Sequence, residues 1–410
     1  MVRMSGPFRV LWLTTASANL GDGVVLTALP LIALAAGASA AEVALVATVA
    51  TVAWPFVGLH AGWVVDRVSV GRLLLAANMM RAGALALLTW AIVADVTALP
   101  AVFAAALVYG VAETVVDTAI TASVPRLVTA PLLTGANSRL EATANTLNAF
   151  AGPPLAGALV SVSATLAAAT GSALYAVTAL GCVFLLRTLR RRSQREPRKP
   201  STDQGRVRDG LVFLWRHPVL RPLTAFTATM NLVWSAWLAV FVVYAVDPGP
   251  LALSPVGYGW LIAAMSIGGI AAAILIPKLR RIVSVPTLLF ADLVGTVLLV
   301  LPAAIGAPLW AIASGIVLAG AGSSVWRILV AVIRQEQTPG ALLGRVYSAS
   351  RVISWGALPV GSALAAVLAN WTGVQSVLTT SSILAVGTAA SFPLLRMRTR
   401  IASMNTPESA

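Results

Sequence analysis

Several acidic and amide side chains stand inside stretches of this sequence that are otherwise apolar. Asp22 is the clearest case, and Thr15, Asn19 and Asp22 follow the spacing i, i+4 and i+7, which places them on one face of a helix. A charged side chain at the centre of a bilayer costs roughly 2.5–3.5 kcal/mol on insertion scales, so such residues face the protein interior and usually mark function. We therefore interpret Asp22 as a carboxylate that binds a proton or a cationic substrate. A buried acid that fixes helix packing through hydrogen bonds is the alternative.

Two later apolar stretches repeat this pattern. Glu113 and Asp117 lie one turn apart on one helical face. Glu141, Asn145 and Asn148 share a face of the next stretch. Trp234 and Trp237 lie in the middle of a later apolar stretch, where each could line a cavity or simply pack in the core. The residues that we expect to bind protons or substrate are Asp22, Asn19, Glu113, Asn145, Asn148, Trp234 and Trp237.

Three charged residues allow two interpretations each. Arg81 either pairs with an acid inside a helix bundle or extends its long side chain to the membrane surface. Glu141 and Asp292 are either functional or placed near the membrane surface, where water solvates them. The sequence does not decide between these roles.

Residue types that support other chemistries are rare. His60 and His217 have no acid or cysteine near them at metal-ligand spacing, and the single Cys182 lies in an apolar run. We also find no nucleophile–base pair and no phosphate-binding loop. We therefore expect no metal, no cofactor and no enzymatic activity.

The composition indicates which elements must position these residues. Of the 410 residues, 58% are hydrophobic and 10% are charged, whereas soluble domains carry roughly 25% charged residues. The chain therefore has too little polar surface to fold in water, and runs of about 20 apolar residues predict membrane-spanning helices. The expected spans are 10–35, 43–65, 73–94, 98–122, 137–161, 164–186, 220–246, 256–277, 286–305, 308–330, 346–369 and 374–395.

The basic residues lie at both termini and in the even-numbered connections between the expected spans. The odd-numbered connections between spans carry only acids, such as Glu42, Asp95 and Asp247. By the positive-inside rule, both termini and the central stretch 187–218 are expected in the cytoplasm. The net charge of +14 would suggest nucleic-acid binding in a soluble protein, but its place in short loops argues against a nucleic-acid partner. The basic positions are Arg3, Arg9, Arg67, Arg72, Arg126, the stretch 187–218, Lys278, Arg280, Arg281, Arg334, Arg396, Arg398 and Arg400.

The two halves of the chain resemble each other weakly. Asn19-Leu20 in the first span matches Asn231-Leu232 in the seventh, and Asn78 and Asp292 each follow a Leu-Leu pair. We therefore expect two pseudo-symmetric six-helix bundles, with a binding cavity where the repeats meet. The expected domains are 1–186 and 219–395 as the two bundles, 187–218 as a cytoplasmic linker with a short amphipathic helix, and 396–410 as a cytoplasmic tail.

Two motifs carry a resemblance to a known superfamily. Residues 62–72 resemble the loop after the second helix of major facilitator transporters, through Gly62, Asp66 and Arg67, although the later Gly-Arg pair that ends at Arg72 is displaced. Residues 152–157 resemble the Gly-Pro-x-x-Gly-Gly motif of the antiporters in that superfamily, with Ala in place of one glycine. The residues of this antiporter motif are Gly152, Pro153 and Gly157.

The chain as a whole is similar to the branch that contains enterobactin exporters and macrolide-efflux proteins. The residues that carry this likeness are 19–23, 213–218 and 344–346. The resemblance implies the major facilitator fold, an all-α integral membrane protein of about twelve transmembrane helices. It also implies export of a small organic molecule by proton antiport with alternating access, by a monomer in the plasma or bacterial inner membrane.

The resemblance further implies a cytoplasmic gate. Asp66 and Arg67 would join the inner ends of neighbouring helices, with Asp117 as a partner of Arg67 or Arg72. The expected partners of the protein are the lipid bilayer, a small-molecule substrate and protons. Uptake or symport of a nutrient is the alternative function, and the sequence does not exclude a membrane sensor or scaffold.

Overall fold

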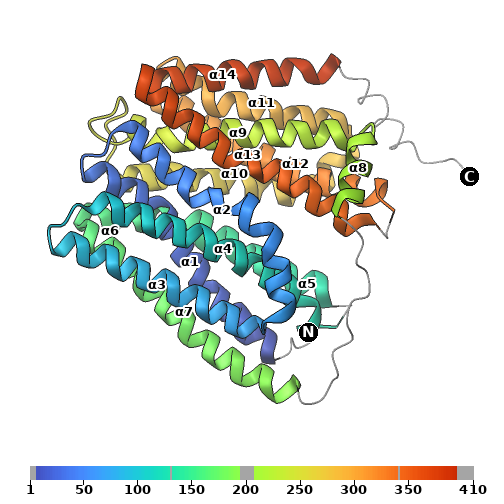
Figure 1. Ribbon diagram of the computed structural model, residues 1–410. Coiled ribbons are helices and arrows are strands. Elements are labelled where there is room, and N and C mark those ends of the chain that lie inside the picture. Colours follow the sequence, from blue (N-terminus) through green and yellow to red (C-terminus); the bar gives the residue numbers. More distant parts are fainter. Residues whose placement is uncertain (1–5, 130–131, 194–206, 340–341, 395–410) are drawn as a thin grey trace, which may run out of the picture. The chain divides into compact units, whose positions relative to one another are not determined.

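The computed structural model describes residues 6–129, 132–193, 207–339 and 342–394 (Figure 1). The predicted tail 396–410 and residues 194–206 of the predicted linker lie outside this part of the chain. Apart from one isolated bridge between Val246 and Leu253, the described elements are helices. The helices are α1 (Gly6–Ala35), α2 (Ala40–Arg67), α3 (Val70–Val93), α4 (Ala98–Leu127), α5 (Leu133–Thr143), η2 (Ala144–Ala151), α6 (Gly152–Val162), α7 (Ala164–Ser193), α8 (Val207–Arg216), α9 (Leu220–Ala245), α10 (Pro255–Ile282), α11 (Val285–Ala304), α12 (Leu309–Gln337), α13 (Leu343–Thr372), α14 (Val374–Ser391) and η4 (Phe392–Leu394).

Within these residues, 10 helices are long and apolar enough to cross a membrane. The two other expected spans are present as helices of different character. The span expected at 137–161 consists of the consecutive pieces α5, η2 and α6. The last span corresponds to α14, which is 18 residues long and rich in Ser and Thr. The all-α membrane architecture predicted from the apolar runs is therefore confirmed.

The break in the fifth span has a local cause. Pro153 and Pro154 have no backbone N–H, so they cannot donate to the carbonyl groups one turn earlier. The residues before them, Ala144–Ala151, form a π-helix, whose wider turn is common where the regular hydrogen-bond ladder is interrupted. The span predicted over 137–161 is therefore present as three consecutive helical pieces.

The ends of several helices follow ordinary capping chemistry. Ser39 and Glu42 form a capping box at the start of α2, in which the Ser39 N–H donates to Glu42 Oε2 over 2.8 Å. Ser284 caps α11 in a similar way through the Thr287 N–H. Gly373 stands at a positive φ of 84° between α13 and α14, a conformation that glycine adopts without steric cost.

The chain divides into two compact units. The first contains the described residues of 1–202 together with 245–263, and the second contains those of 203–244 and 264–410. In the first unit α3 packs on α7, α2 on α4, and α1 on α6 and α7; in the second α11 packs on α12 and α14, and α13 packs on α8 (Figure 1). The segment 245–263 thus groups with the first unit rather than with the rest of 219–395.

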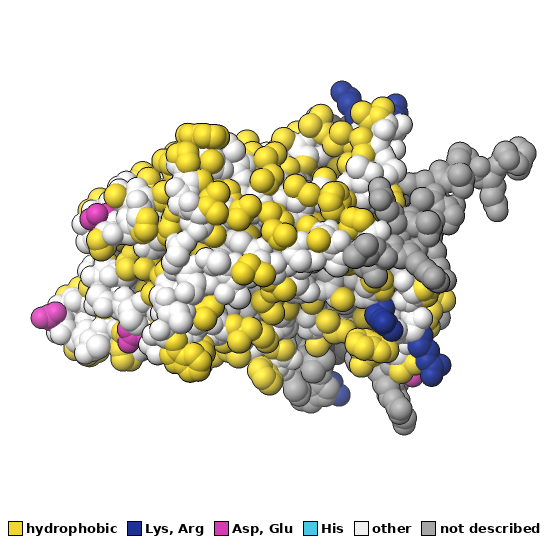
Figure 2. Space-filling model, turned by 90° about the horizontal axis from the view of Figure 1, so that it is seen from above, with side chains coloured by type: hydrophobic (Ala, Val, Ile, Leu, Met, Phe, Trp, Pro, Cys, Tyr) yellow, Lys and Arg dark blue, Asp and Glu magenta, His cyan; other side chains and the backbone are white. Residues whose placement is uncertain are grey.

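The outer surface is apolar. On the face shown in Figure 2, hydrophobic side chains cover most of the described surface, and charged side chains gather at its ends. Large apolar side chains such as Phe56, Trp310 and Trp371 are 69%, 73% and 77% exposed. Such a surface suits contact with lipid rather than water.

Candidate functional site

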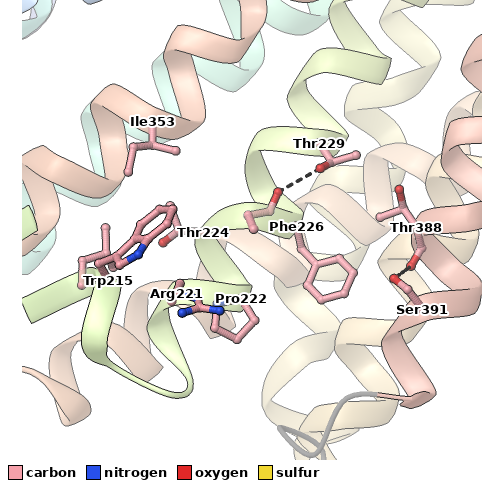
Figure 3. Close-up of a pocket in the computed structure, with 11 residues that line it drawn as sticks. Trp215, Arg221, Pro222, Thr224, Phe226, Thr229, Ile353, Thr388 and Ser391 are labelled. Atoms are coloured by element: carbon pink, nitrogen blue, oxygen red, sulfur yellow. Dashed lines mark hydrogen bonds between the residues drawn. The ribbon is translucent and has the colours of Figure 1, made fainter.

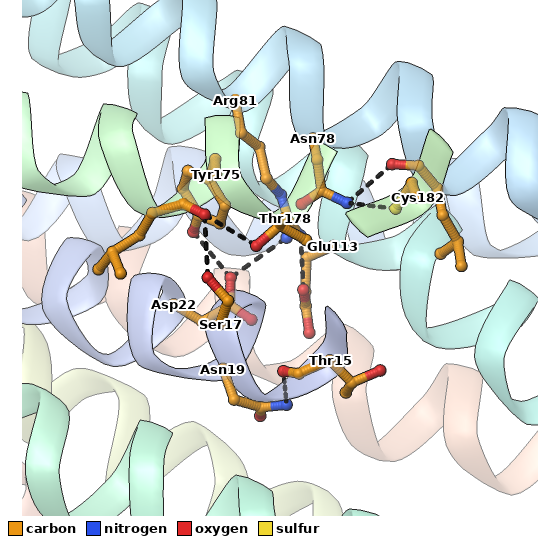
Figure 4. Close-up of polar contacts among 12 residues, drawn as sticks. Thr15, Ser17, Asn19, Asp22, Asn78, Arg81, Glu113, Tyr175, Thr178 and Cys182 are labelled. Atoms are coloured by element: carbon orange, nitrogen blue, oxygen red, sulfur yellow. Dashed lines mark hydrogen bonds and ion pairs between the residues drawn. The ribbon is translucent and has the colours of Figure 1, made fainter. Parts of the chain in front are cut away.

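Four helices of the first unit bring a buried ionic cluster together. Arg81 of α3 places Nη1 3.2 Å from Asp22 Oδ1 of α1 and Nη2 2.5 Å from Glu113 Oε2 of α4 (Figure 4). The hydroxyl of Tyr175, in α7, donates a hydrogen bond to the same Asp22 oxygen over 2.7 Å. Arg81 is 1% exposed and Asp22 is 4% exposed. We call Asp22, Arg81, Glu113 and Tyr175 the ionic cluster.

Aromatic rings complete the surroundings of the arginine. The Arg81 guanidinium carbon lies 5.1 Å from the ring centroids of both Tyr109 and Tyr175. Attraction between a cation and an aromatic ring adds to the ion pairs and is strongest away from water. Removing charges from water costs several kcal/mol per ion, so these contacts are needed to hold Arg81 inside the helix bundle.

The charges of the cluster do not balance. With both carboxyl groups ionised, one guanidinium faces two negative charges. One added proton, or one cationic group of a bound molecule, brings the net charge of the ionic cluster to zero. Since like charges at close range disfavour each other's ionisation, the cluster is chemically suited to binding one proton or one cation.

Glycines in α1 allow the helices to come close enough for these contacts. A Cβ atom on Gly21 would lie 3.1 Å from the Tyr175 ring, which is tighter than ordinary packing. A Cβ atom on Gly152 of α6 would lie 2.5 Å from the Cα atom of Gly23. Asp22 is therefore held between two close helix crossings, one with α7 and one with α6.

A cavity of about 530 Å³ opens beside the cluster. Volumes between roughly 300 and 1,000 Å³ are typical of pockets for small molecules. Asp22 and Glu113 form part of its wall, with residues of α1, α4, α5 and η2. Four acids line this cavity and no Lys or Arg is among its described lining residues, which are Thr15, Ala18, Asn19, Asp22, Glu113, Val116, Asp117, Ile120, Thr121, Val124, Asn137, Ser138, Leu140, Glu141 and Ala144.

The second unit contains a cavity of different chemistry. It measures about 450 Å³ and lies among α8, α9, α13 and α14 (Figure 3). Its one charged lining residue among those described is Arg221, whose guanidinium lies 5.6 Å from the ring of Trp215. No acid is among the described residues that line this cavity.

Comparison with known proteins places the chain in a family. A family model described as transmembrane secretion effector matches residues 4–409. The chain belongs to this family. It is also similar to an uncharacterized MFS-type transporter, y4rN, of Sinorhizobium fredii (strain NBRC 101917 / NGR234), with 26% identity over 272 residues, 66% of this chain and 65% of the relative.

Solved structures support the same fold. A nucleoside transporter, NupG, superimposes with a TM-score of 0.71 at 17% identity over 95% of this chain and 99% of its own. A bacterial homologue of the iron transporter ferroportin, in an inward-facing state, gives a TM-score of 0.73 at 16% identity over 95% and 98%. The family match and this fold together show a membrane transporter of the major facilitator type, as the sequence resemblance indicated.

The three residues predicted to share one face of the first span also lie together in the structure of this transporter. Thr15, Asn19 and Asp22 all line the cavity beside Glu113. The amide of Asn19 donates to the Thr15 carbonyl oxygen over 2.9 Å, and the Thr15 hydroxyl donates to the Leu11 carbonyl oxygen over 2.8 Å. These helix-internal bonds fix the side chains that form the cavity wall beside Asp22.

Asp22 does not stand alone in the structure. Arg81 pairs with it instead of extending to the membrane surface, so the open choice for Arg81 is resolved. Tyr109 and Tyr175, which complete the site, were missed. Tyr109 stands one turn before Glu113 in α4, and this spacing could have pointed to it. Tyr175 has only Ser172 and Thr178 as polar neighbours one turn away in α7, which is too weak a signal to single it out.

The other predicted substrate residues lie elsewhere. Asn145 and Asn148 fall in η2 and are not among the described residues that line the cavity; Asn145 Nδ2 lies 3.5 Å from Glu141 Oε1. In the second unit Trp234 donates from Nε1 to Thr296 Oγ1 over 3.1 Å. Trp237 is fully buried and stacks on Phe241 with ring centroids 4.1 Å apart, so for this residue the core-packing alternative holds.

The structure describes only some of the side chains in the two motifs. The side chain of Asp66 and the surroundings of Gly62 lie outside the described part. Arg67 is exposed at the end of α2, and Arg72 donates from Nε to Ser69 Oγ over 3.0 Å. The link from Asp117 to either arginine stays a prediction.

The antiporter motif forms close helix contacts. Gly152, Pro153 and Gly157 are all buried at the start of α6. A Cβ atom on Gly157 would meet the Pro255 carbonyl oxygen, and one on Gly259 would meet the Pro153 carbonyl oxygen. Small residues at such crossings let two helix backbones approach each other, so α6 packs tightly against the first turns of α10 within the first unit.

Proposed function

We propose that this transporter exports a small organic molecule in exchange for protons. The observation that carries the proposal is the shared arginine: Asp22 and Glu113 both contact Arg81 and both line the cavity of about 530 Å³. A proton or a cationic group balances the excess negative charge of the ionic cluster. Because only one of them is needed, a proton and a substrate would compete for the site, which is the simplest way to couple opposite movements.

The acidic lining favours one substrate class. Asp117 and Glu141 add two further carboxyl groups to the wall that holds Asp22 and Glu113. We therefore propose a substrate that carries a cationic group, such as an amine. Substrate binding from the cytoplasm would release the proton inward, and a proton from outside would release the substrate. Rocking of the two six-helix halves would expose the site to one side at a time.

The direction of transport rests on separate grounds. Export agrees with the description of the family as secretion effectors and with the antiporter-like motif at Gly152, Pro153 and Gly157. The experiment is efflux from cells or proteoliposomes that contain the protein, against a panel of antibiotics, siderophores and metabolites that includes cationic and anionic members. We expect efflux of cationic compounds. Accumulation inside cells would favour the alternative, nutrient uptake.

We further propose that both termini and residues 187–218 face the cytoplasm of a cell membrane. Single cysteines placed at Ala38 and at Ser193, in a chain in which Cys182 is replaced, are expected to react oppositely with an impermeant thiol reagent in intact cells. The cysteine at position 38 should be labelled from outside, since its loop carries no basic residue. Labelling of position 193 from outside would show that the orientation is reversed.

A second prediction concerns the inner gate. We propose that Asp117 pairs with Arg67 or Arg72 when the cavity opens outward. Asp117→Arg is expected to reduce efflux about tenfold or more, because two like charges then meet at the inner helix ends. Combining it with Arg67→Asp or Arg72→Asp should restore part of the rate, measured in the same cells at matched protein levels. If neither double variant exceeds Asp117→Arg, the pairing does not exist.

A further inference from the structure

The second unit contains a buried acid that the proposed function does not use. Asp292 of α11 is 2% exposed, and its Oδ1 atom has no hydrogen-bond partner. Asp22, in contrast, accepts bonds from Arg81 and Tyr175. Within the described residues no basic side chain forms an ion pair with Asp292, so nothing there compensates a negative charge on it.

The immediate surroundings of Asp292 are apolar and closely packed. Leu288 and Leu289, one turn before it in α11, and the adjacent Leu293 belong to the apolar core of the second unit. A Cβ atom on Gly322 of α12 would lie 2.7 Å from Asp292 Oδ1 and 2.8 Å from its Cα atom. The acid therefore lies in a tight contact between α11 and α12, which we call the α11–α12 contact.

The ionisable residues around this contact do not neutralise Asp292. Helices α12 and α14 pack along α11, and α9 contacts it through the hydrogen bond from Trp234 to Thr296. The ionisable residues of α9 are Arg221, whose guanidinium lies beside the Trp215 ring, and Tyr244. Helix α14 contains no ionisable residue, and α12 contains Arg327, Arg334 and Glu336. Arg327 and Glu336 are exposed, and the Arg334 guanidinium lies 5.5 Å from the Tyr347 ring. An isolated carboxylate in such surroundings is costly enough that it takes up a proton instead.

The first unit contains a neutral side chain at the matching position. Asn78 follows Leu74-Leu75 as Asp292 follows Leu288-Leu289. Asn78 is also 2% exposed, its Oδ1 atom also lacks a partner, and its Nδ2 donates to the Leu74 carbonyl oxygen over 2.7 Å. A protonated carboxyl has nearly the same shape as this amide and can likewise donate a hydrogen bond. The second unit therefore differs from the first in having a group that can lose its proton.

We propose that Asp292 holds a proton in this state and is a second proton-exchanging site of the transporter. Its role in transport rests on the proposed proton-coupled function, since opening the α11–α12 contact to water would let Asp292 release its proton. A sodium ion is a poor occupant, because hard cations take several oxygen ligands and the apolar surroundings of Asp292 do not provide them.

The test is infrared spectroscopy of the full-length protein in lipid, with protons as the only ligand. The wild type is expected to show the carbonyl stretch of a protonated carboxylic acid that Asp292→Asn lacks. This band should shift in D₂O and lose intensity as the pH is raised. Asp95→Asn, which changes an exposed acid in a loop, is the matched control and should keep the band.

This experiment needs no transported compound, and its outcomes distinguish a proton-exchanging Asp292 from the other roles of a buried acid. Equal bands in the wild type and Asp292→Asn would mean that Asp292 is ionised, and a band lost on addition of Na⁺ would mean a cation site. A band that responds neither to D₂O nor to pH would mean a sealed structural acid. Each of these results overturns the inference, whatever becomes of the export function. If Asp292→Asn does not fold, Asp292→Glu should shift the band instead of removing it.

Discussion

Asp22→Asn is expected to abolish efflux driven by a pH gradient while the protein inserts normally into the membrane. The amide keeps the shape of the protonated carboxyl, and its oxygen can still accept from Arg81 and Tyr175, which now contact Asp22 at 3.2 and 2.7 Å. Arg81 retains Glu113 as its counter-charge. The variant therefore loses a proton site without leaving a buried charge unpaired, so transport rather than folding should fail.

The measurement compares gradient-driven efflux with exchange of labelled compound in the absence of a gradient. Asp22→Asn should lose at least a hundredfold in gradient-driven rate, equivalent to roughly 2.7 kcal/mol. Exchange should also weaken, because the cluster is then neutral without a bound proton or cation. Asp95→Asn serves as the control, because Asp95 is exposed and stands at a φ of 54°, a conformation that Asn tolerates well. Normal proton-driven efflux by a well-expressed Asp22→Asn protein would transfer the coupling role to Glu113.

Replacement of Arg81 is expected to have the largest effect on stability. Arg81→Met leaves Asp22 and Glu113 facing each other without a cation in a site where the arginine is 1% exposed. Removing one partner of a buried pair typically costs about 3–5 kcal/mol. We expect low abundance in the membrane and a strongly lowered melting temperature in detergent. Arg139→Met, at an exposed arginine beside Trp12, should change both values little.

A charge-balanced variant separates electrostatics from shape. Combining Arg81→Met with Asp22→Asn and Glu113→Gln removes all three charges while the side chains keep similar lengths. The triple variant should regain most of the lost melting temperature, because no buried charge is left unpaired. It should still be inactive, since neither carboxyl group of the ionic cluster remains. A triple variant as unstable as Arg81→Met would mean that packing of the guanidinium, rather than its charge, holds α1, α3 and α4 together.

Periodicity within one helix predicted part of this site. Thr15, Asn19 and Asp22 share a face because their spacing follows the helix repeat, and the structure places them together at the cavity. The apolar runs predicted the helices, and a charged residue inside such a run indicated an interior position. These inferences succeed because each depends only on residues that are neighbours along the chain.

Contacts between helices could not be predicted in this way. Arg81, Glu113 and Tyr175 come from three different helices, and which faces meet depends on how those helices pack. Trp237 shows the same limit, because its burial in the core depends on the helices around α9, although its stacking partner Phe241 lies one turn later in the same helix. The π-helix before Pro153 was also missed, because a proline pair predicts a break but not the form of the turn that replaces the α-helix.

The most direct test of proton-coupled export is proton movement in proteoliposomes that contain a pH-sensitive dye. An outward gradient of the compound identified in the efflux panel, imposed at equal pH on both sides, is predicted to drive protons in the opposite direction. The wild type should change the internal pH, and a variant with both Asp22→Asn and Glu113→Gln should not. Movement of the compound with no proton flux, or with protons in the same direction, would contradict the proposed antiport.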